Sequence, residues 1–92
     1  MADFLVEVYT PRLDRAALAK SVAGLKAAAE AMSAEIPVTY VRAIHVPEDE
    51  TCFHLFEAES AEVVWEAGRR AGLTFDRITE AVEPVTSEGG AR

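Results

Sequence analysis

The chain has 92 residues, of which half are hydrophobic, and its formal net charge is -7. This is the size of one domain, with enough apolar residues for a folded core. The acidic balance argues against nucleic acid and against anionic membranes as partners, since both attract clustered Lys and Arg. The lone cysteine, Cys52, cannot form an intrachain disulfide, and the first residues lack signal-peptide features. We therefore expect a soluble cytoplasmic protein.

The first half of the chain predicts a strand followed by a long helix. Residues 3–9 alternate between an apolar set and a mixed set, which is typical of a strand with one face on a core. Asp14 is placed to cap a helix that reaches to about Ser33. Its apolar residues recur at steps of four and three, and they are Leu18, Val22, Leu25, Ala29 and Met32.

The second half predicts a hairpin, a helix and a last strand. Residues 38–46 and 51–58 read as strands joined by the turn Pro47-Glu48-Asp49-Glu50. Ser60 caps a second helix that ends near Gly72, and a final strand begins at Ile78 and stops before Pro84. We assign residues 1–84 to one domain and expect residues 85–92 to be a disordered tail.

The order strand, helix, strand, strand, helix, strand predicts an α+β fold of the ferredoxin-like type. Right-handed crossovers turn this order into a split βαβ sandwich, a four-stranded antiparallel sheet with two helices on one face. The other sheet face is then bare. A chain this small commonly covers such a face with a second copy, so we expect a homodimer.

A symmetric turn would pair Val46 with Thr51, and this register assigns the hairpin side chains to the two faces. Arg42 and Glu57 do not belong under alanine-rich helices, so their face is the bare one, and Tyr40 goes with them. A one-residue bulge would change this assignment. In the last strand, Thr79 and Ala81 are placed inward and Ile78, Glu80 and Val82 outward, because the opposite choice would bury Glu80.

The bare face is thus predicted to be apolar with a few polar side chains, the composition of a dimer interface or a ligand pocket. The candidate ligand-binding residues are Glu7, Tyr9, Tyr40, Arg42, Glu57 and Glu80. They allow three interpretations. One is a binding protein for a metal ion or small molecule, and another is an interaction protein with ion pairs at a dimer rim. The third is a cofactor-independent isomerase, cyclase or oxygenase, with carboxylates as acid and base.

The histidines and the cysteine share the opposite face in this register. Imidazole and thiolate are suitable ligands for zinc or nickel. However, the face that holds His45, Cys52 and His54 lies under the helices. We interpret the two histidines as hydrogen-bonded core residues, with a place at the edge near the turn as the alternative for His45. We interpret Cys52 as a small apolar group, and we assign no metal ligand.

The segment VPEDETCFHLFEAESAEVVWEAGRRAGLTFDRITEAVE, with FLVEVYTPRLD near the start, resembles a family of small bacterial proteins of mostly undetermined function. That family includes actinobacterial nickel-binding, nickel-responsive proteins that have a ferredoxin-like fold and dimerise. The resemblance covers nearly the whole chain up to Pro84, and it implies a dimeric binding protein with nickel as a candidate cofactor. Nickel-binding members carry adjacent histidines at the end of the first strand, where this chain has Val8, Tyr9 and Thr10.

Overall fold

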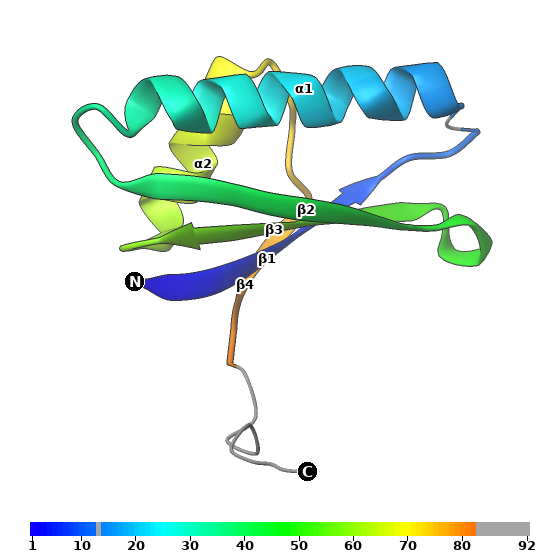
Figure 1. Cartoon of the computed structure of the whole chain (residues 1–92). Helices are drawn as coiled ribbons and strands as arrows, with labels where there is room; N and C mark the ends of the chain where they lie inside the picture. Colours follow the sequence, from blue (N-terminus) through cyan, green and yellow to red (C-terminus); the bar gives the residue numbers. More distant parts are fainter. Residues whose placement is uncertain (13, 83–92) are drawn as a thin grey trace, which may run out of the picture.

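A computed structural model of the chain describes residues 1–12 and 14–82. The elements follow in the order β1 (Ala2–Tyr9), α1 (Arg15–Met32), β2 (Val38–Val46), β3 (Thr51–Ala58), α2 (Ala61–Arg70) and β4 (Arg77–Ala81). The strands form one antiparallel sheet in the order β2-β3-β1-β4, and both helices lie on one side of it (Figure 1). The predicted ferredoxin-like α+β fold is confirmed. The predicted tail, residues 85–92, lies outside the described residues.

Local signals set the ends of both helices. The Asp14 side chain accepts a hydrogen bond of 2.7 Å from the Ala17 amide, which caps α1 as the sequence predicted. The second helix begins after Ser60 and ends at Arg70, and the chain then turns at Gly72, whose φ of +75° is a backbone conformation that favours glycine. No helix within the described ranges is long and apolar enough to cross a membrane.

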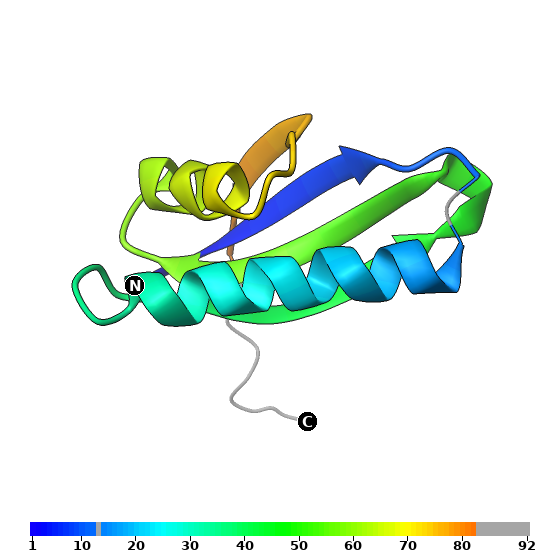
Figure 2. The same cartoon turned by 90° about the horizontal axis from the view of Figure 1, so that it is seen from above.

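The two helices differ in length and therefore cover the sheet unequally. Helix α1 has 18 residues and follows β2, whereas α2 has 10 and packs over β3 and β4 (Figure 2). Only the second half of α1 is buried deeply, through Leu25, Ala28, Ala29 and Met32. Between the helices and the sheet, the fully buried side chains with the largest volume are Phe56, Leu25, His54, Val6, Val64 and Cys52.

The hairpin contains one extra residue, and this residue changes the predicted faces. Val46 pairs with Thr51 and Arg42 with Leu55, as the symmetric turn predicts, but Tyr40 then pairs with Phe56. Val41 is the bulged residue between the two registers, and its side chain is 42% exposed. The placement of Tyr40 on the bare face was therefore wrong. Its ring packs edge-on against the Phe56 ring, with 5.1 Å between centroids, on the helix side.

The predicted faces of the last strand were also wrong. Val6 is a core residue and pairs with Ile78, so Ile78 and Glu80 point to the helix side, and Thr79 and Ala81 to the other. The reason is that β4 is an edge strand. Ile78 packs against the core, while Glu80 on the same face remains exposed to water at the margin of the sheet.

Two glycines on the helices test how tightly the helical layer is packed. A Cβ added at Gly68 would lie 2.5 Å from the Phe75 ring, whereas one added at Gly24 would meet the Ala71 Cβ at 3.8 Å, an ordinary contact.

Gly68→Ala is expected to lower the free energy of unfolding by about 1–3 kcal/mol, because the added methyl group overpacks the core against Phe75. Gly24→Ala is expected to raise it by about 0.5–1 kcal/mol, because alanine is the better helix former and its Cβ has room. Urea denaturation of both variants measures the two values. Equal effects of the two substitutions would contradict this description of the packing.

Candidate functional site

The sheet face turned away from the helices, called the open face from here on, is arranged in rows that cross the strands. The first row contains Ile44, Phe53, Glu7 and Arg77, and the second contains Arg42, Leu55, Leu5 and Thr79. The third row contains Thr39, Glu57, Asp3 and Ala81. Apolar side chains of three strands therefore meet at the centre of the face. Ile44 is 49% exposed there, and Leu5, Phe53 and Leu55 are partly exposed.

The charged side chains of the open face are spread around this apolar centre. Glu7 and Arg77 are cross-strand neighbours with 3.9 Å between Oε2 and Nε, a loose and exposed pair. Arg42 lies opposite Leu55, and Glu57 opposite Thr39. Arg42 and Glu57 are not cross-strand partners, and they form none of the ion pairs found within the described residues.

The structure does not gather the six predicted ligand-binding residues. Glu7, Arg42 and Glu57 lie on the open face, but each stands in a different row. Tyr9 lies at the end of the face with 59% exposure, and its hydroxyl donates to Glu50 Oε1 at 3.3 Å. The Glu50 carboxylate raises the pKa of Tyr9. Tyr40 and Glu80 are on the helix side, so the six residues form no common pocket.

Tyr40 instead belongs to a buried polar pair. Its hydroxyl lies 2.8 Å from Nδ1 of His54, a side chain that is only 2% exposed. Burial lowers the pKa of His54 to about 4 and raises the pKa of Tyr40 to about 12, so both groups are neutral near pH 7. In the neutral ring one nitrogen carries the proton and the other accepts, so the tautomer of His54 sets which atom donates in the hydrogen bond between Nδ1 and the Tyr40 hydroxyl. The prediction that His54 is a hydrogen-bonded core residue is confirmed.

The remaining donors on the helix side are His45 and Cys52, which are cross-strand partners. Cys52 is fully buried, and burial raises the pKa of its thiol, so the thiolate that binds metals is disfavoured. His45 is half-buried near the turn, and its Nε2 is buried without a hydrogen-bond partner in the described part of the chain.

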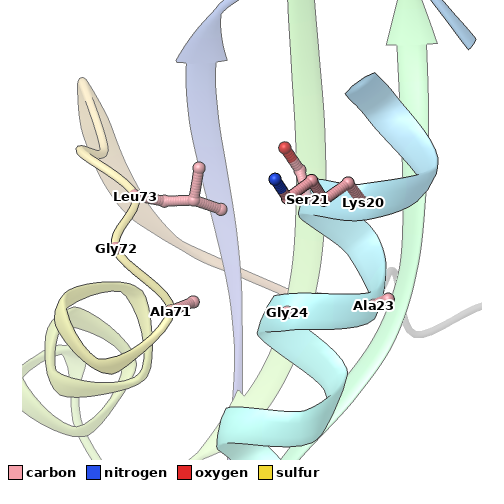
Figure 3. A pocket seen from close by; sticks show the side chains of 7 residues that line it. All are labelled: Lys20, Ser21, Ala23, Gly24, Ala71, Gly72 and Leu73. Atoms are coloured by element: carbon pink, nitrogen blue, oxygen red, sulfur yellow. The ribbon is translucent and has the colours of Figure 1, made fainter. Parts of the chain in front are cut away.

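Pockets large enough for a small molecule lie on the helix side of the sheet. One pocket of about 570 Å³ opens between α1 and the segment that follows α2 (Figure 3). We call it the wedge, and its lining residues are Lys20, Ser21, Ala23, Gly24, Ala71, Gly72 and Leu73. A smaller pocket of about 250 Å³ lies between α1 and β2 and includes Tyr40. Sequence reasoning missed the wedge, although a glycine inside an alanine-rich helix was a signal for it.

Comparison with known proteins agrees with this architecture. Residues 4–81 match the family described as nickel responsive protein SCO4226-like. The chain belongs to this family. It is also similar to the crystal structure of SCO4226 from Streptomyces coelicolor A3(2), with 23% sequence identity and a TM-score of 0.73. That similarity covers 91% of this chain and 100% of the other, and it shows a shared fold. No curated protein matches the chain.

The nickel in the family's description can be tested against the donors of this chain. Within residues 1–12 and 14–82, no three His, Cys, Asp or Glu side chains are grouped so that they could hold a metal ion. Nδ1 of His54 is engaged by Tyr40, and Cys52 is a buried thiol. The end of β1 carries Tyr9 and Thr10. The described donors of this chain therefore do not fit a nickel site.

The buried His54 predicts a pH dependence of stability. As the pH falls below the ordinary value of 6.5, the unfolded chain takes up a proton, while the folded chain stays neutral until about pH 4. The free energy of unfolding should therefore be highest above pH 6.5 and should fall between pH 6.5 and 4 by on the order of 3 kcal/mol.

Urea unfolding at a series of pH values measures this slope. His54→Gln is the matched variant, because it retains His45 and every carboxylate and removes only the buried imidazole. Its stability at neutral pH is expected to be lower, but its slope between pH 6.5 and 4 should be much smaller. Parallel pH profiles of the two proteins would show that His54 is not held neutral.

Proposed function

We propose that this protein is a small homodimeric binding protein whose subunits associate through the open face. The observation that supports this proposal most directly is the apolar centre of that face. It joins Ile44 on β2, Phe53 and Leu55 on β3, and Leu5 on β1, and neither helix covers it. Contiguous apolar surface with a polar rim is typical of protein interfaces.

The charges around the apolar centre support self-association. Glu57 and Asp3 make the third row acidic, whereas Arg77 and Arg42 stand in the first and second rows. In a two-fold dimer the same patch meets itself, and an axis that runs along the rows brings the third row of one subunit toward the first row of its partner, which contains Arg77 beside Glu7. Association of this kind would desolvate the apolar centre and pair charges that are exposed in one subunit.

A binding role is favoured over catalysis because the predicted acid–base groups do not converge. Glu7 and Glu57 stand two rows apart, and Tyr40 and Glu80 are on the other side of the sheet. A general acid and base must both reach one substrate, which these positions do not allow. The donor set of one subunit also favours a small organic ligand over nickel. Nickel is nevertheless the first metal to test, because the family's description names it.

Ile44→Glu is expected to convert the dimer to a monomer, because a carboxylate would be buried at the centre of the interface without a partner. Light scattering after size exclusion measures the change, from twice 10.0 kDa to 10.0 kDa. Trp65→Glu is the matched control, since Trp65 is 46% exposed but belongs to α2 on the other side of the molecule. A wild-type monomer, or a dimer that Trp65→Glu dissociates and Ile44→Glu does not, would refute this interface.

Calorimetric titration of the dialysed protein with nickel(II) is expected to show no stoichiometric binding at micromolar concentrations. The physical reason is the lack of three grouped donors among the described residues. Zinc(II) is a suitable second titrant, because imidazole and thiolate would bind it as well. One equivalent of tightly bound nickel would contradict this prediction, and loss of that binding in His45→Ala would identify the imidazole responsible.

A further inference from the structure

The wedge exists because the two helices have different lengths. Helix α2 ends at Arg70 and the chain turns at Gly72. The first half of α1 extends beyond this end of α2 and has no helix beside it. The residues that approach each other across the gap are small, with Gly24 on one wall and Ala71 on the other. In Figure 3 the gap lies between α1 and the segment Ala71–Leu73. Its volume, about 570 Å³, is in the range of small-molecule sites.

Gly24 is not explained by the packing of the helices. Glycine inside a helix lowers its stability, and the neighbouring residues of α1 are largely alanine. Gly68 is required, because a Cβ there would collide with Phe75 at 2.5 Å. At Gly24 the added Cβ would only touch the Ala71 Cβ at 3.8 Å. The helix pair therefore accepts alanine at this position, and what glycine contributes is empty space in the wedge.

Two polar groups enter this apolar gap from the same side. Ser21 and Lys20 are three and four residues before Gly24, so all three positions lie on one face of α1. In Figure 3 the Lys20 nitrogen and the Ser21 oxygen are on the side of α1 that faces Leu73. No Asp or Glu is among the lining residues, and Lys20 takes part in none of the ion pairs of the described ranges.

We propose that the wedge binds a small amphipathic carboxylate. Its apolar body would lie against Gly24, Ala71 and Leu73, while its carboxylate accepts hydrogen bonds from the Lys20 ammonium and the Ser21 hydroxyl. A charge-assisted hydrogen bond to an ammonium favours an anion over a neutral molecule of the same shape.

This inference names a ligand class for the proposed binding role. It rests on the binding role and does not depend on the proposed dimer interface. The wedge and the open face are on opposite sides of the sheet, so dimerisation and ligand binding are separate measurements. Octanoate binding by the monomeric Ile44→Glu variant would show that the wedge is independent of the interface. A dimer that binds no octanoate would refute the wedge and leave the interface standing.

The test is a titration of the ¹⁵N-labelled full chain with octanoate, followed by amide chemical shifts. Saturable shifts are expected at Lys20, Ser21, Gly24, Gly72 and Leu73. Gly24→Leu fills the gap and should abolish them, and Gly24→Ala, which the fold accepts, should weaken binding without loss of structure. Shifts that do not saturate, or that map to the open face, would overturn the proposal.

The role of the ammonium is tested with Lys20→Met, which keeps the aliphatic length at an exposed position. Octanoate is expected to bind about tenfold more weakly to this variant, because a hydrogen bond to a charged group is lost. Octanol, which has the same chain without the charge, should bind both proteins equally. Undiminished octanoate affinity in Lys20→Met would overturn the proposed anion recognition.

Discussion

The buried hydrogen bond between Tyr40 and His54 is the constraint on which the arrangement of the hairpin depends. His54 is almost completely enclosed on the helix side of β3, and an imidazole in that position is costly without a partner. Tyr40 provides the partner only because the bulge at Val41 shifts β2 by one residue and turns the tyrosine inward. Arg42 stays opposite Leu55, as the symmetric turn predicts, and Glu57 lies opposite Thr39 on the same open face. This polar contact in the core thus goes together with the side of the sheet on which Tyr40 lies.

The molecule divides its surface into two parts with different chemistry. The open face is apolar at its centre and carries charges of both signs around it, a composition that suits a second copy of the chain. The helix side contains the cavities, because a long α1 and a short α2 cannot close over the same length of sheet. The family match extends over residues 4–81, and among the described residues of that range no group of three donors fits the nickel of the family's description.

Much of the fold followed from local patterns. The alternation in residues 3–9, the Asp14 cap, the start of α2 after Ser60, and the pairing of Val46 with Thr51 were all predicted correctly, although the Ser60 side chain makes no capping hydrogen bond. Each depends on residues close in sequence, whose periodicity or backbone chemistry is the same in any tertiary setting. The burial of His54 was also predictable, because its neighbours on that face of β3 are Cys52 and Phe56.

The sequence by itself therefore determined the element order, the ferredoxin-like fold and the assignment of Arg42 to the open face. Only the tertiary structure decided the side of Tyr40 and Glu80, because a period of two cannot reveal a bulge and does not distinguish an edge strand from a central one. The tertiary structure also decided whether the wedge forms. The space next to Gly24 depends on where α2 ends relative to α1, and this relation between distant segments is set by the packing of both helices on one sheet.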